Sequence, residues 1–206
     1  MVKILEVHPL NPEPRVLERA ARVLRDGGVI VYPTDTVYGI GCDITRQAAI
    51  ERISWIKGRD PKKPFSLVSP DLSAVSKYAK VSNYSFRILK RFLPGAYTFV
   101  LAGNKEVPKG LRSRQKTVGI RIPDHPVPLG LVKLLGRPII STSANKSGED
   151  IITDPAELES RLGRLVDLIL SCGPLPVLPS TVVSLIGDRA EVLRHGAGDA
   201  SFFSEP

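Results

Sequence analysis

Segments with helical periodicity alternate along this chain with short β-branched runs that are typical of buried strands. Apolar residues recur at helical spacing over Glu13–Asp26, and the strand-like run Val29–Tyr32 follows. The same order continues to the last predicted strand, Ala190–Arg194, which a turn at Gly187-Asp188 precedes. This alternation predicts an α/β fold, and the late hairpin favours a twisted mixed sheet with flanking helices over a purely parallel one.

The same two periodicities predict the remaining elements. The predicted helices are Thr45–Lys57, Asp71–Tyr78, Ser82–Phe92, Val127–Leu135 and Asp154–Leu162. The predicted strands are Phe65–Ser69, Ala96–Ala102, Thr117–Pro123, Pro138–Ser143, Val166–Leu170 and Thr181–Leu185. Because the chain has 206 residues and no internal repeat, we expect a single domain over residues 1–206.

The composition narrows the kinds of partner. The net charge is +8 and the pI is about 9.7, which favours an anionic ligand such as a nucleotide or RNA. Cys42 and Cys172 lie far apart and the three histidines are dispersed, so we expect neither a disulfide nor a metal site. The sequence has no leader pattern and no run long enough to span a membrane, so we expect a cytoplasmic protein without a membrane partner.

Polar clusters follow predicted strands, at positions that commonly line ligand sites in α/β sheets. Pro33–Gly41 offers hydroxyls, a carboxylate and a phenol, and Ile140–Gly148 offers hydroxyls and a carboxamide. Between them, Lys57–Lys63 places four cations within seven residues, a density suited to phosphate oxygens. The two common phosphate-binding loops are absent, so a bound nucleotide would depend on such scattered side chains. Taken singly, each cluster also fits a polar turn or a solvated helix end.

Arg121 lies within an otherwise apolar strand, so it either faces solvent or has a buried partner. The period of two places it on one face with Thr117, Gly119 and Pro123. We predict that this face is polar and forms a cavity wall. His125 follows between two prolines, where a structural role is more common than that of a base.

Together these segments resemble the YrdC-type threonylcarbamoyl-AMP synthase family, with features of its YciO-like branch. The resemblance runs from about Gly28 to Gly196 and depends on seven motifs in order. The motifs are Pro33-Thr34-Asp35-Thr36-Val37-Tyr38-Gly39, Lys57-x-Arg59 with Lys63-Pro64, Pro94-Gly95-x-x-Thr98, Gly119-Ile120-Arg121-x-Pro123-x-His125-Pro126, Ser143-x-Asn145, Ser180-Thr181-Val182-Val183 and Arg194-x-Gly196. A match at seven ordered places is far more specific than any one of them.

The resemblance implies a single α/β domain around a deep, positively charged cavity. It also implies a nucleotidyltransferase that condenses L-threonine, bicarbonate (or CO2) and ATP, with Mg²⁺, into threonylcarbamoyl-AMP and pyrophosphate. Partner proteins would then pass the activated group to the adenosine next to the anticodon of tRNA, forming t6A.

The same resemblance implies roles for three groups of residues. The catalytic tetrad around the ATP phosphates would be Lys57, Arg59, Ser143 and Asn145. ATP would also contact Lys63, Thr117 and Arg194. L-threonine would be held by Thr36, Arg121, Ser141 and Ser180, with its carboxylate on Arg121. No metal ligand in the protein is implied.

Departures from the family pattern leave alternatives open. A histidine that contacts threonine in several members corresponds here to Val68, and Ser141-Thr142-Ser143 and Lys62–Phe65 are closer to the YciO-type branch. One alternative is therefore a YciO-type relative that binds or hydrolyses a related acyl adenylate. Another is a module that binds tRNA or double-stranded RNA, which the five cations and one acid of Lys105–Lys116 support.

Overall fold

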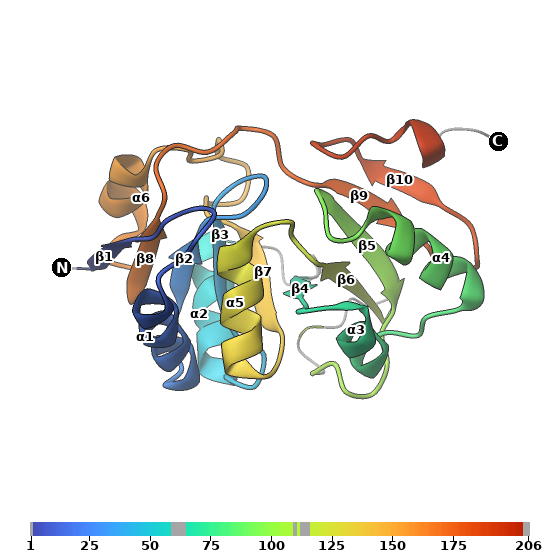
Figure 1. Ribbon diagram of the computed structural model, residues 1–206, viewed down its shortest axis with the longest axis horizontal. Coiled ribbons are helices and arrows are strands. Elements are labelled where there is room, and N and C mark those ends of the chain that lie inside the picture. Colours follow the sequence, from blue (N-terminus) through green and yellow to red (C-terminus); the bar gives the residue numbers. More distant parts are fainter. Residues whose placement is uncertain (1, 59–64, 109–110, 112–115, 204–206) are drawn as a thin grey trace.

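One mixed sheet of ten strands runs through the molecule (Figure 1). The structure, a computed structural model, describes residues 2–58, 65–108, 111 and 116–203. The strands are β1 (Lys3–Glu6), β2 (Ile30–Tyr32), β3 (Gly39–Asp43), β4 (Ser66–Val68), β5 (Tyr97–Ala102), β6 (Thr117–Arg121), β7 (Ile139–Ser143), β8 (Leu168–Ser171), β9 (Thr181–Ser184) and β10 (Glu191–Arg194). The helices are α1 (Pro14–Arg25), α2 (Gln47–Lys57), α3 (Leu72–Tyr78), α4 (Asn83–Phe92), α5 (Pro126–Leu135), α6 (Pro155–Leu162) and the short η2 (Ser201–Phe203).

The strand order is β1-β8-β2-β3-β7-β4-β6-β5-β9-β10. Strand β8 is parallel to β1 and β2, β4 is parallel to β6, and β5 is parallel to β9. The other neighbouring pairs are antiparallel. The predicted fold class, an α/β domain with a mixed sheet and flanking helices, is therefore confirmed.

The two faces of the sheet are covered differently. Helices α2, α3, α4 and α6 contribute apolar side chains such as Ile53 and Leu89 to the larger core on one face. Helices α1 and α5 pack on the other face, where Leu24 and Leu131 meet side chains of β2, β7 and β8. No described residue of β5, β6 or β9 belongs to this second core. Beyond α1 and α5, that face is therefore free to form the wall of a cavity.

Local sequence signals set the ends of several helices. Asp71 caps α3, because its carboxylate accepts a hydrogen bond from the backbone N–H of Ala74 at 2.9 Å. Gly58 and Gly136 end α2 and α5 in the left-handed conformation, with φ of 53° and 72°. These were the residue types that predicted the boundaries, and the predicted helices are all present.

The sequence patterns do not predict two of the strands. Strand β1 is a four-residue edge strand that pairs only with the distant β8. Strand β3 begins at Gly39, so the predicted polar loop Pro33–Gly41 ends at Tyr38. Its alternating glycines break the β-branched pattern from which buried strands are recognised.

Two other expectations concern the chain as a whole. The cation-rich segment Lys105–Lys116 lies partly outside the described residues, but Val107 and Leu111 within it are buried in the larger core. None of the helices in the described part of the chain is both long and apolar enough to cross a bilayer.

Candidate functional site

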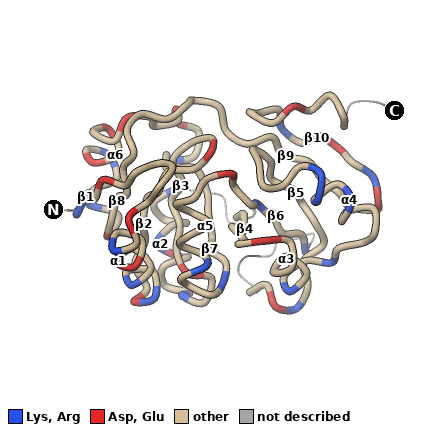
Figure 2. The backbone as a smooth tube through the Cα atoms, viewed as in Figure 1, with Lys and Arg blue, Asp and Glu red and all other residues tan. Residues whose placement is uncertain are grey.

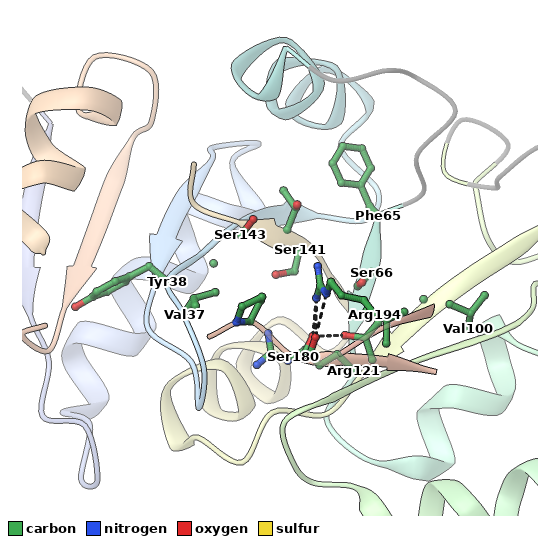
Figure 3. Close-up of a pocket in the computed structure, with 16 residues that line it drawn as sticks. Val37, Tyr38, Phe65, Ser66, Val100, Arg121, Ser141, Ser143, Ser180 and Arg194 are labelled. Atoms are coloured by element: carbon green, nitrogen blue, oxygen red, sulfur yellow. Dashed lines mark hydrogen bonds between the residues drawn. The ribbon is translucent and has the colours of Figure 1, made fainter. Parts of the chain in front are cut away.

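A cavity of about 220 Å³ opens on the sheet face that α1 and α5 leave uncovered (Figure 3). Residues of strands β3 to β7, β9 and β10 line it, and on β5 and β6 they lie at alternate positions, because successive residues of a strand point to opposite faces. Its charged lining residues are Arg121 and Arg194, and its other polar side chains all carry hydroxyl groups. No carboxylate belongs to the described wall, so the cavity offers hydrogen-bond donors and positive charge to an anion.

Arg121 is held by the loop that follows β2. Its Nη2 donates to Asp35 Oδ1 at 2.5 Å, to Thr36 Oγ1 at 2.6 Å and to Thr34 Oγ1 at 3.3 Å. The side chains of Arg121 and Asp35 are each only 10% exposed, so the ion pair is buried. The Nε of Arg121 is also buried, yet it has no hydrogen-bond partner among the described residues. A donor left unpaired in a protein interior costs about 1–3 kcal/mol, so a small shift of the side chain that brings this atom to a ligand oxygen in the adjoining cavity would be favoured.

Arg194 brings a second guanidinium to the cavity. Its Nε and Nη2 donate to the carbonyl oxygen of Ser180 at 3.2 and 2.7 Å, and Nη2 also reaches Ser180 Oγ at 3.3 Å. Ser180 Oγ in turn lies 2.9 Å from Thr98 Oγ1. Burial, and then the charge of Arg121, lower the pKa of Arg194 below its ordinary value. Since two cations repel each other here, an anion bound between them would be stabilised.

Lys57 fixes the turn that follows β7. Its Nζ donates to the carbonyl oxygen of Ser143 at 2.8 Å, to Asn145 Oδ1 at 2.9 Å and to the carbonyl oxygen of Asn145. Ser143 Oγ also donates to Asn145 Oδ1 at 2.6 Å. Lys57 is 4% exposed and does not belong to the cavity wall, whereas Ser143 does. The ammonium group of Lys57 therefore holds the turn that carries Ser143, and its charge adds to the positive potential of the cavity.

The structure places the predicted site residues in four groups. The residues on the cavity wall are Arg121, Ser141, Ser143, Ser180 and Arg194. The residues that contact a wall residue from behind are Thr36, Lys57 and Asn145. Their polar groups are bonded to protein atoms, so these residues support the wall. Thr117, at the far end of β6 from Arg121, is buried and does not line the cavity. The remaining two, Arg59 and Lys63, lie outside the described residues.

Sequence reasoning missed three contributors to the site. Asp35 is the buried partner of Arg121, and the signal for it was the requirement that a buried arginine be paired. Thr98 and Tyr32 contact the wall hydroxyls of Ser180 and Ser141, and the sequence gives no sign of either contact.

Two further residues have structural roles. Val68 packs in the smaller core beneath α1 and α5 and does not line the cavity. His125 caps α5, because its Nδ1 accepts a hydrogen bond from the N–H of Val127 at 3.2 Å. Its structural role is therefore as expected.

Charge elsewhere is less concentrated than in the cavity. In the view of Figure 2, Lys and Arg lie at both ends of the molecule and are interspersed with Asp and Glu. Among the residues for which positions are described, no three His, Cys, Asp or Glu side chains gather to hold a metal ion. The cavity is thus the clearest anion-binding feature of the described chain.

Comparison with known proteins identifies similar chains. A family model for the Sua5, YciO and YrdC proteins, described as "Telomere recombination", matches residues 22–196. The Escherichia coli K12 protein YciO, described as uncharacterized, is 42% identical over 98% of this chain and 100% of its own length. The crystal structure of E. coli YciO superposes with a TM-score of 0.95 over the same shares of the two chains.

Other similar proteins have named activities or ligands. The threonylcarbamoyl-AMP synthase of Nitrosococcus oceani is 40% identical over 73% of this chain and 82% of its own length. The Sua5 protein of P. abyssi, solved in complex with L-threonine, is 30% identical, with a TM-score of 0.88 over 94% of this chain and 57% of its own. The family model and the full-length similarity to YciO agree with the seven motifs and the fold. The chain belongs to the Sua5/YciO/YrdC family.

Proposed function

We propose that the cavity binds a small carboxylic or carbamic acid joined to AMP, and that the protein acts on the bond between them. The observation that carries this proposal is the guanidinium of Arg121, whose buried Nε lacks a partner beside a cavity with no lining carboxylate. The carboxyl or carbamoyl group joined to AMP is no longer an anion, so a second, free carboxylate of the ligand would satisfy this donor through a charge-assisted hydrogen bond. The hydroxyl groups around it suit a small acid that itself carries polar groups.

The second guanidinium suits the phosphate of the adenylate. Arg194 and the hydroxyl of Ser143 share the cavity with Arg121, so the two parts of an acyl adenylate would each meet a donor. When an adenylate forms or breaks, negative charge develops on the α-phosphate and on the leaving group, and fixed cations stabilise it. Mg²⁺ would enter bound to the phosphate oxygens of ATP, its usual partners. Such a reaction requires positioning and charge, without a protein nucleophile.

The similarity over the full length of YciO, whose activity is not named, favours the first candidate, in which this protein binds or hydrolyses a related acyl adenylate. The similarity to a threonylcarbamoyl-AMP synthase supports the second candidate, in which L-threonine, bicarbonate and ATP are condensed and the product serves t6A formation on tRNA. Both candidates use the same cavity but catalyse different reactions. Synthesis joins the acid to the α-phosphate of ATP and releases pyrophosphate, whereas hydrolysis breaks that bond with water and releases AMP.

The test is an assay of both reactions, synthesis and hydrolysis. The protein is incubated with ATP, bicarbonate and one amino acid, either threonine, serine, valine or 2-aminobutyrate, and pyrophosphate and product mass are measured. In parallel, threonylcarbamoyl-AMP made by a known synthase is supplied, and release of AMP is measured. Pyrophosphate that depends on both threonine and bicarbonate identifies synthesis, and AMP release alone identifies hydrolysis. If neither occurs while RNA binds tightly in a mobility-shift assay, the proposal is wrong and the RNA-binding alternative replaces it.

A further inference from the structure

Tyr32 reaches the cavity wall by crossing a neighbouring strand. It ends β2, and its hydroxyl contacts Ser141 of β7, although β3 lies between these two strands in the sheet. The ring passes over β3 at Gly39 and Gly41. A Cβ atom at Gly39 would lie 3.2 Å from Tyr32 Cζ, and one at Gly41 would lie 3.0 Å from Tyr32 Cε1. Gly39 therefore leaves space in which the tyrosine meets Ser141. Gly41 leaves space for the ring and also for the Ile140 carbonyl, which would lie 2.5 Å from such a Cβ atom.

The direction of this hydrogen bond follows from burial. Tyr32 is 0% exposed, and Ser141 Oγ, at 2.6 Å, is the partner of its hydroxyl. Because a buried hydroxyl proton must have an acceptor, Tyr32 donates and Ser141 accepts. Burial raises the pKa of Tyr32 to about 12, so the phenol keeps this proton at neutral pH.

The proton of Ser141 is thereby left for another acceptor. Ser141 Oγ has no second hydrogen-bond partner among the residues that the structure describes, and Ser141 lines the cavity. A serine hydroxyl is ordinarily both donor and acceptor, and it adapts to its ligand by rotating. With Tyr32 donating to it, this hydroxyl presents mainly its proton to the cavity.

We propose that Tyr32 is a positioning residue that makes Ser141 a hydrogen-bond donor to the acid bound at Arg121. This inference rests on the proposed function, since it concerns how the same cavity selects its ligand. The hydroxyl of Ser141 and the guanidinium of Arg121 then both donate hydrogen bonds. The cavity beside them therefore accepts an anionic oxygen and rejects an ammonium group. The two glycines of the Pro33–Gly41 segment thus act on ligand choice through the path they leave for the ring.

The test is a double-mutant cycle with L-threonine as the probe, measured by calorimetry on the full chain. Tyr32→Phe keeps the ring but removes the donor, and Ser141→Ala removes the group that it orients. Each single change is expected to weaken L-threonine binding about five- to tenfold, the scale of one hydrogen bond. Tyr32→Phe in the Ser141→Ala background is expected to cause no further loss, because the oriented hydroxyl is already absent.

The matched control is Tyr78→Phe, which alters another buried tyrosine, 6% exposed in the larger core and absent from the cavity wall. It is expected to leave L-threonine affinity unchanged, and all four variants are expected to bind ATP as the parent does. If Tyr32→Phe weakens L-threonine binding equally with and without Ser141, or behaves like Tyr78→Phe, the inference is overturned. If the parent protein does not bind L-threonine, the proposed function fails with this ligand, and the inference falls with it.

Discussion

Replacing Arg121 with lysine separates its two roles. In the structure, Nη2 holds Asp35 and the two flanking threonines, while the buried Nε has no partner among the described residues. Lysine keeps a positive charge beside the buried carboxylate but has one nitrogen in place of the fork. It can therefore stabilise Asp35 or bind the acid, but not both with the original geometry. The expected loss is one charge-assisted hydrogen bond, about 1.5–3 kcal/mol, or roughly 10- to 150-fold in the Kd of the acid.

The assay combines calorimetry with denaturant unfolding. Arg121→Lys is expected to weaken L-threonine binding by that factor, to leave ATP binding nearly unchanged and to unfold close to the parent midpoint. Arg121→Ala is the comparison, because it leaves the buried Asp35 carboxylate without a cationic partner and should cost about 3–5 kcal/mol of stability. Parent-like L-threonine affinity in Arg121→Lys would refute the carboxylate role. Parent-like stability in Arg121→Ala would refute the claim that the buried ion pair matters to folding.

Three further predictions concern the supports of the site and the fold. Lys57→Met should lower stability by at least about 1–3 kcal/mol in denaturant unfolding, because the buried carbonyl of Asn145 loses its donor. Unchanged stability would show that Lys57 does not hold the turn. Arg137→Ala should lower the free energy of unfolding by about 3–5 kcal/mol, because the carboxylate of Asp43, which is 0% exposed, loses the guanidinium that donates to both of its oxygens. A shift of the denaturation midpoint no larger than that of a surface substitution would contradict this. Burial lowers the pKa of the His125 imidazole in the folded protein below the value of about 6.5 in the unfolded chain. As the pH falls below about 6.5, the unfolded chain takes up the proton more readily than the folded protein, so stability should fall. His125→Ser, which can still cap the helix, should flatten that fall in unfolding curves between pH 7.5 and 5, and an equally steep fall would assign it to other groups.

The fold class was within reach of the sequence because its signals are local. A proline, a capping side chain and an apolar stripe lie within one helix, so α3 and α5 could be recognised from their own residues. Strand β3 was not recognised, because its glycines make room for close neighbours on other strands, among them the Tyr32 ring and the Ile140 carbonyl, and carry no β-branched side chain. Strand β1 depends on pairing with β8, far along the chain, and four residues carry too little pattern to reveal it.

The sequence by itself determined the alternation of elements, the polar face of β6 and the motifs that identify the family. Only the tertiary structure decided which polar groups meet. Asp35 and Arg121 lie 86 residues apart, and Tyr32 and Ser141 lie 109 apart. Side-chain periodicity tells which residues share a face within one strand, but strand order and register decide which faces become neighbours. Strand order and register depend on burial summed over the whole sheet. They place Arg121 and Arg194 on the cavity wall and Lys57 behind it.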